Sequence, residues 1–465
     1  MGTRARRALI LALAFAGVAT EARAQIQTPR PASALFFGSA YDPKITERLD
    51  AFLNVAGAYD GQAVQDTTGR VVPGLSPLQR SGFYNDLTGG LSYNWTGQRA
   101  QFGASGGASG RYYGQDGFLW LNEFVSAGLT AELTRRVALS VNQSISYSPP
   151  YFNSLTPGFE SPALGTAVGA GSNYSVAPQQ AYLYDTSVTI SRALSPRSSF
   201  SVLAEYRFYN TATGYQLANT PTGYPLAKFK TYGVGGRYTR NLSKSVGLRL
   251  GYVYREGLYG VVAGVPSASH DIDVGIDYKR ALSFSKRTVV NFSVGSTILN
   301  SSSTAALVRN VYGVTGASAL ARNLQFGVTG NVGLTHDMGR TWRARLMYDR
   351  GLTFSEAVQG PIFADSIRAN LGGLFSKRAD FESEAAAFLG DVAYGSPTPA
   401  SRLQNYEAHA RVRFALASWA AVYTEYVYYR YSVGSAVLVT PGIPSLLNRN
   451  SVRLGLSFWA PLLRK

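Results

Sequence analysis

Short stretches of alternating apolar and polar residues recur about every 23 residues from Thr46 to Trp459. In residues 87–96, for example, Leu, Tyr and Trp alternate with Thr, Ser and Asn. A period of two places one set of side chains on each face of a β-strand. Many such strands, with no helical segment to cover their apolar faces, predict a closed antiparallel transmembrane β-barrel with lipid outside and water inside.

The alternation predicts an all-β chain of eighteen strands. They are expected at 46–60, 83–96, 99–113, 118–133, 136–148, 181–193, 198–209, 228–240, 243–255, 269–281, 286–297, 323–336, 341–353, 365–377, 380–394, 403–416, 418–432 and 449–460. Sixteen or twenty strands are the alternatives, because the loop pattern requires an even number.

The connections between these strands alternate between short turns and longer loops. Gly97-Gln98 and Thr134-Arg135 are short, whereas 61–82, 149–180 and 298–322 are long. Outer-membrane barrels have short periplasmic turns and longer external loops. The pattern therefore predicts a protein of the cell outer membrane with both termini in the periplasm. The loop at 149–180 either folds into the lumen or stands outside it.

The N-terminus predicts export. Arginines precede a short apolar stretch, and Ala22-Arg23-Ala24 forms an A-x-A site, so residues 1–24 are expected to be a signal peptide. Residues 25–45 are expected to form a periplasmic segment, either a tail or a strip in the barrel mouth. The barrel itself is expected over 46–460, followed by a C-terminal tail over 461–465.

Composition agrees with an outer-membrane barrel. The chain has no cysteine, so it forms neither disulfides nor thiolate metal sites, and it holds 30 tyrosines. Tyrosine suits the two membrane interfaces, where its ring meets lipid and its hydroxyl reaches the headgroups. An aromatic girdle is predicted at Tyr59, Tyr93, Trp95, Tyr147, Tyr182, Tyr206, Tyr252, Tyr278 and Tyr348.

The layout resembles bacterial outer-membrane porin-like barrels over essentially the whole mature chain. The last strand, with Val452, Leu454, Leu456 and Phe458 alternating with polar residues, looks like the C-terminal assembly signal of such barrels. Here six residues follow Phe458 and Trp459, whereas the family usually ends on the aromatic residue. The basic charge and the ending Pro461-Leu462-Leu463-Arg464 are also similar to barrels associated with polysaccharide export. The resemblance implies outer-membrane lipid, lipopolysaccharide and the barrel-assembly machinery as partners, and a periplasmic polysaccharide-export complex as a further one.

The charge balance suggests a basic lumen. The whole chain carries a formal +17, and removing residues 1–24 leaves about +14. Rings of Arg or Lys in a pore attract anions. The polar faces of the predicted strands place the following residues in the lumen: Arg237, Arg249, Arg343, Arg345, Arg368, Glu407, His409, Arg411, Arg413 and Arg453.

Two features weaken that interpretation. Many cations, such as Arg135, Arg136 and Arg378, fall at predicted periplasmic turns, where they would meet lipid phosphates. The polar faces also hold acids, including Asp273 and Glu382, and porins commonly oppose acidic and basic residues across the constriction to orient water and solutes.

Other functions are disfavoured. The three histidines, His270, His336 and His409, match neither a Ser–His arrangement nor a metal-ligand spacing, so no enzyme, cofactor or metal is expected. No basic face with interleaved aromatic residues predicts nucleic-acid binding. The sequence therefore predicts a channel for passive diffusion or export of polar, anionic solutes such as oligo- or polysaccharides. The alternative is a barrel closed by its loops that acts as an adhesin or structural protein.

Overall fold

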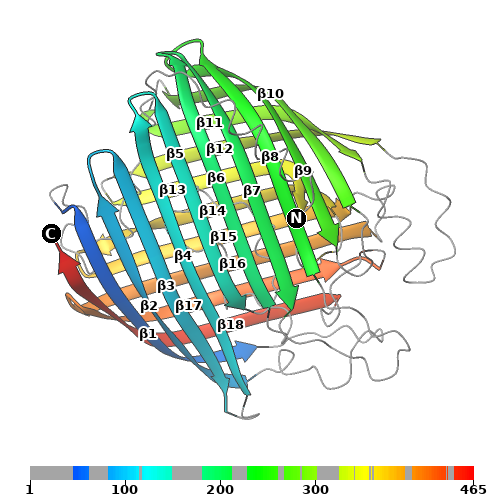
Figure 1. Cartoon of the computed structure of the whole chain (residues 1–465). Coiled ribbons are helices and arrows are strands. Elements are labelled where there is room, and N and C mark those ends of the chain that lie inside the picture. Colours follow the sequence, from blue (N-terminus) through cyan, green and yellow to red (C-terminus); the bar gives the residue numbers. More distant parts are fainter. Residues whose placement is uncertain are drawn as a thin grey trace.

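The described residues of the computed structural model form a closed ring of eighteen antiparallel strands (Figure 1). The structure describes residues 45–61, 82–114, 118–148, 181–211, 228–259, 266–282, 285–300, 324–339, 341–354, 358, 361–392, 401–435, 437 and 445–465. Each strand pairs with its neighbours in sequence, and β1 pairs with both β2 and β18, which closes the ring. The predicted fold class and strand count are confirmed.

The strands are long enough to cross a bilayer, which takes about 9–11 residues of a tilted strand. Their bounds are β1 Glu47–Gly61, β2 Gly82–Thr96, β3 Ala100–Tyr113, β4 Phe118–Thr134, β5 Val137–Ser148, β6 Ala181–Ser195, β7 Ser198–Thr211, β8 Lys228–Asn241, β9 Val246–Tyr259, β10 Pro266–Leu282, β11 Ser285–Asn300, β12 Leu324–Met338, β13 Trp342–Phe354, β14 Pro361–Ser376, β15 Ala379–Val392, β16 Arg402–Ala417, β17 Ala420–Val433 and β18 Leu446–Arg464. Among the described residues, no helix is long and apolar enough to cross a membrane.

The last strand corrects the predicted C-terminal boundary. β18 runs to Arg464, so residues 461–464 belong to the barrel wall, where the sequence predicted a tail. Pro461 suggests a strand end because it lacks an N–H group. Here the ladder with β1 shifts register between Leu49 and Asp50, beside Pro461, and then continues to the pair Arg48–Arg464.

Several predictions fall outside the described residues. These are the signal peptide at 1–24, the N-terminal segment up to residue 44, and the loop at 149–180.

The two faces of the wall have opposite polarity. On β1, Leu53, Val55 and Tyr59 point outward and are 41–45% exposed. On the opposite face of the same strand, Ala56, Ala58 and Asp60 point inward and are buried. The other strands repeat this arrangement, with exposed outward residues such as Leu87, Val125, Val274, Val328, Leu346 and Leu454. An apolar outer face and a polar inner face are the reverse of a soluble protein and suit a barrel in lipid.

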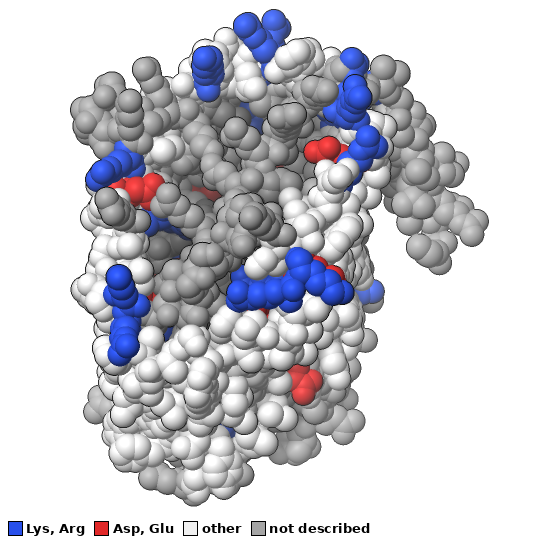
Figure 2. All heavy atoms as spheres, turned by 90° about the vertical axis from the view of Figure 1, so that its left-hand side faces the viewer, with Lys and Arg blue, Asp and Glu red and all other residues white. Residues whose placement is uncertain are grey.

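Four of the described short turns share one hydrogen bond that the alternation does not predict. The hydroxyl oxygens of Thr134, Ser195, Ser243 and Ser376 each accept a hydrogen bond from the backbone N–H two residues later, at 3.1–3.2 Å. In three of these turns that later residue is an exposed arginine: Arg136, Arg197 or Arg378. Figure 2 shows this end of the barrel, with blue basic side chains spaced around its rim and few acidic ones.

Near the long-loop end, the ends of both β12 and β13 extend beyond their mutual pairing. β12 and β13 pair from Met338–Trp342 to Gly330–Arg350. Beyond that point, at the long-loop end, β12 and β13 no longer pair with each other. Residues 324–329 of β12 pair with β11, and residues 351–354 of β13 pair with β14. We call this opening in the ladder the β12–β13 seam.

Candidate functional site: the lumen wall

Most charged side chains on the inner face form arginine–carboxylate pairs. They gather in three groups. The β1–β18 network lies on β1–β3, β17 and β18, the β15–β16 ladder lies on β14–β16, and the β7–β10 network lies on β6–β10.

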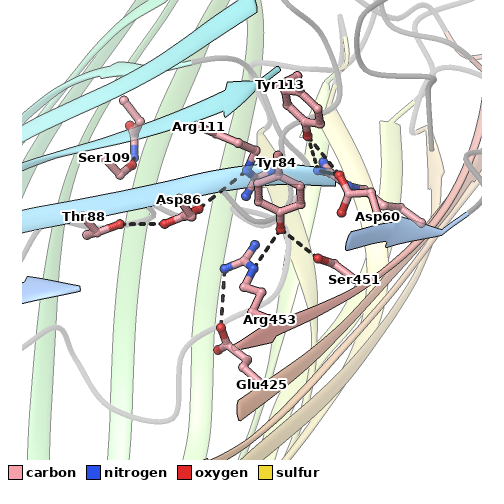
Figure 3. Close-up of polar contacts among 12 residues, drawn as sticks. Asp60, Tyr84, Asp86, Thr88, Ser109, Arg111, Tyr113, Glu425, Ser451 and Arg453 are labelled. Carbon is pink, nitrogen blue, oxygen red and sulfur yellow. Dashed lines mark hydrogen bonds and ion pairs between the residues drawn. The ribbon is translucent and has the colours of Figure 1, made fainter. Parts of the chain in front are cut away.

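Tyr84 is at the centre of the β1–β18 network (Figure 3). Its hydroxyl accepts a hydrogen bond from Nε of Arg453 at 2.9 Å and shares another with Ser451 at 2.7 Å. A second guanidinium, from Arg111, lies 4.5 Å from the centre of the Tyr84 ring. Arg453 also pairs with Glu425 at 3.4 Å.

The same network continues toward the long-loop end. Arg449 pairs with Asp60 and donates to the Tyr113 hydroxyl at 2.8 Å, and that hydroxyl donates to Asp60 at 2.9 Å. Arg111 approaches Asp86 at 3.6 Å. The three arginines are only 2–5% exposed, although they lie on the inner face. Because a buried charge is tolerated only when it is paired, these contacts are essential to this part of the wall.

Strand register creates the β15–β16 ladder. Asp380, Glu382 and Glu384 follow one another on the inner face of β15 and lie opposite Arg413, Arg411 and His409 of β16. Two of these opposed pairs are ion pairs, Asp380–Arg413 at 2.5 Å and Glu382–Arg411 at 2.7 Å.

Arg368 of β14 links two strands of this ladder. It pairs with Glu384 on β15 and, at 2.9 Å, with Glu407 on β16.

The β7–β10 network repeats this arrangement on another part of the ring. Arg255 pairs with Glu205 at 2.6 Å and with Asp271. Asp273 forms ion pairs with Arg249 at 2.5 Å and with Arg237 at 3.2 Å. A further pair joins Arg207 to Asp185 at 3.0 Å.

Between the β1–β18 and β7–β10 networks, the inner face of β3–β5 is rich in hydroxyls. Ser105 and Ser126 share a hydrogen bond at 2.9 Å across β3 and β4. Thr130 and Ser140 do so across β4 and β5 at 3.4 Å. This hydroxyl wall offers donors and acceptors without net charge.

The residues predicted to line the lumen lie on the inner face but belong to different groups. Arg237 and Arg249 are in the β7–β10 network, Arg368, Glu407, His409, Arg411 and Arg413 are in the β15–β16 ladder, and Arg453 is in the β1–β18 network. Arg343 pairs with Asp337 at 2.6 Å near the short-turn end, and Arg345 follows it on the same face.

Sequence reasoning missed several members of these groups. Arg111, Arg449 and Arg255 share the inward parity of residues that were predicted, so the alternation contained the signal that places them on the inner face. The alternation does not predict the ion pairs, because the partner of each arginine depends on the register between strands.

The predicted girdle residues lie on the outer face at two levels. Tyr93, Trp95 and Tyr278 are near the short turns, and Tyr59, Tyr147, Tyr182 and Tyr206 are nearer the long loops. Several pair with other rings, including Tyr59 with Phe83 at 5.0 Å and Tyr147 with Tyr182 at 4.7 Å between ring centres. Tyr252 is 46% exposed and its hydroxyl forms a hydrogen bond with His270. Tyr348 is 37% exposed and its hydroxyl donates a hydrogen bond to Asp365.

The predicted assembly residues lie on the outer face of β18. Val452, Leu454 and Leu456 are 42–64% exposed, and Phe458 stacks on Trp419 with ring centres 6.1 Å apart.

Neither the protein-family models nor the curated proteins compared with this chain match it. Among solved structures, OccK2 (OpdF) of Pseudomonas aeruginosa in complex with glucuronate is 10% identical, with a TM-score of 0.41 over 90% of this chain and 98% of that one. OccAB4 of Acinetobacter baumannii is 9% identical, with a TM-score of 0.39 over 91% and 100%. The siderophore receptor PirA of Pseudomonas aeruginosa is 7% identical, with a TM-score of 0.40 over 89% and 80%. These likenesses are distant, and the fold rests on the closed strand pairing itself.

Proposed function

We propose that this chain is an outer-membrane channel through which small polar solutes diffuse passively. The observation that carries the proposal is the reversed polarity of the closed ring, apolar outside and polar inside. Closed barrels satisfy every backbone polar group within lipid, and rings of about 16–18 strands are wide enough to hold an aqueous lumen. The short-turn end then faces the periplasm, and its basic rim meets phospholipid phosphates.

The lumen suits hydroxyl-bearing solutes. The hydroxyl wall on β3–β5 and the ion-paired side chains opposite it both exchange hydrogen bonds with alcohols and carbonyls. Sugars and other small polyols have this chemistry. No contact among the described residues favours export of a polymer over passage of such small solutes.

Ion pairing changes the expected selectivity. Unpaired arginines would attract anions, but carboxylates lie 2.5–2.9 Å from Arg413, Arg411 and Arg368 and offset their charge. We therefore propose weak anion preference, with neutral sugars passing as well as anionic ones.

Solute flux into vesicles tests the proposal. The refolded protein in liposomes should admit small neutral sugars and exclude larger oligosaccharides, and swelling rates should fall steeply with solute size. Liposomes that hold the unfolded protein serve as the control. A folded barrel that admits no sugar, even in the variants described below, would rule out a channel.

One observation favours the alternative of a closed, structural barrel. At the long-loop end, Leu352 of β13 packs across part of the lumen against Ala181, Tyr209 and Phe229 of β6–β8. A permanent closure of this kind would leave all variants impermeable.

A further inference from the structure

The long-loop end of the β13–β14 hairpin lies inside the ring. Lower in the wall, Leu346, Tyr348 and Ile367 of these strands point outward and are 37–45% exposed. Leu352 and Phe363 are direct partners on that same face of the hairpin, yet both meet inner surfaces of the barrel.

Leu352 shows how far the hairpin end reaches. It packs against the buried cluster of Ala181, Tyr209 and Phe229 on the inner faces of β6–β8. Four strands separate β8 from β13 in the ring, which corresponds to about 24 Å along the wall at the usual strand spacing. The end of β13 therefore leaves the wall and crosses part of the lumen.

Phe363 places the neighbouring strand in the same way. A Cβ atom built on Gly327 of β12 would lie 2.5 Å from the Phe363 ring. Because Phe326 and Val328 point outward, with 69% and 53% exposure, position 327 faces inward. The outer face of β14 thus rests on the inner face of β12, and only glycine leaves room for it there.

The other face of the hairpin end is also buried. Ile362 and Ala364 join an apolar cluster on the inner faces of β14–β18 that includes Phe388, Leu403, Tyr429 and Leu447. The apolar packing therefore extends from β6–β8 through the hairpin end to β18, which bridges the lumen at one level.

The bend coincides with the β12–β13 seam. The last β12–β13 pair is Gly330–Arg350, and Arg350 pairs there with Asp365 at 2.9 Å and lies 5.0 Å from the Phe363 ring. Beyond the seam, residues 351–354 of β13 keep their backbone pairing with β14 but have no described pairing with β12.

We propose that the hairpin end, residues 351–353 and 361–364, is a hydrophobic gate that closes the lumen on Leu183, Tyr209 and Phe229 and swings at Arg350–Asp365. This rests on the proposed channel function. An apolar constriction blocks water and solutes by dewetting, and a narrow opening of it sets the size of solute that passes. The gate is built from the ends of two wall strands, β13 and β14.

Two variants open the gate by different means. Gly327→Val places a side chain where Phe363 rests, and Leu352→Ser removes the apolar contact with β6–β8. Each has a matched control. Gly57→Val adds the same side chain at an exposed position with no described atom within 4 Å of its Cβ. Leu346→Ser makes the same change on the same face of β13, where Leu346 is 44% exposed.

The readout is time-averaged current in a planar bilayer, with folding checked by heat modifiability on a gel. We expect both gate variants to conduct at least several-fold more than the wild type, and both controls to match it. Equal currents in the wild type and the folded gate variants would overturn the gate and leave the channel intact. A further variant replaces residues 352–363 with a short Gly-Ser linker. If this variant, the wild type and both gate variants all fold and carry no current, the proposed channel itself is overturned.

Discussion

At the residue scale, register gives each charged side chain its role. The same arginine is a free anion site or half of an ion pair depending on which residue lies opposite. Asp380 faces Arg413 and Glu382 faces Arg411 because β15 and β16 pair in one register, and a shift by one residue would send one partner outward. The periodicity of the sequence predicts the face of each residue but not this alignment, which is why a basic lumen was expected and a paired one was found.

The buried pair Asp60–Arg449 should be the most sensitive in the wall. Asp60→Asn leaves the Arg449 guanidinium buried without a counter-charge, and we expect a loss of about 3–5 kcal/mol in the free energy of unfolding. Urea unfolding in detergent measures it. Asp185→Asn, at a pair whose side chains are 25–28% exposed, should cost about 1 kcal/mol or less. Equal losses in the two variants would show that burial does not set the contribution of these pairs.

The β15–β16 ladder should set ion selectivity by the balance of its charges. Arg411→Gln with Arg413→Gln leaves two carboxylates uncompensated, so the reversal potential in a salt gradient should shift toward cations. Asp380→Asn with Glu382→Gln should shift it toward anions. Shifts in the same direction, or none in folded protein, would contradict a lumen of balanced charge.

At the element scale, strand positions could be predicted closely and the largest errors have a structural cause. β14 was expected from 365 but begins at Pro361. Its first residues are buried on both faces, because one face meets β14–β18 and the other rests on β12, so no polar alternation marks them. The last strand is predicted to end at 460, whereas β18 continues through Pro461 to Arg464, and the register shift in β1 that accommodates the proline is invisible in the sequence.

The extra residues of β18 should help to close the ring. The backbone N–H groups of Thr46 and Glu47 donate to the carbonyl of Lys465 at 2.7 and 3.1 Å, and Lys465 donates back to Glu47 at 3.0 Å. Deleting residues 461–465 removes these bonds and exposes the edge of β1, so we expect slower folding and a lower melting temperature on heat-modifiability gels. Lys465→Ala keeps the backbone bonds and should behave as the wild type. A truncated chain that folds and melts normally would show that closure is complete before Pro461.

At the scale of the whole molecule, an apolar exterior, a paired polar interior and one inturned hairpin together support the proposed channel. In that proposal the ring supplies the aqueous path, the balanced charges keep it from holding any ion tightly, and the hairpin end closes it at the long-loop side. The sequence predicts the ring because periodicity is local. It does not predict the hairpin's position, because that depends on contacts between strands far apart in the ring, such as Leu352 with Phe229.

Single-channel recording of the refolded protein tests the central claim most directly. In a planar bilayer under a salt gradient, we predict discrete openings with a reversal potential near zero, rare in the wild type and frequent in Gly327→Val. A bilayer that stays silent with both proteins and with the variant in which a Gly-Ser linker replaces residues 352–363, while gels show folded barrels, would contradict an aqueous path through the ring.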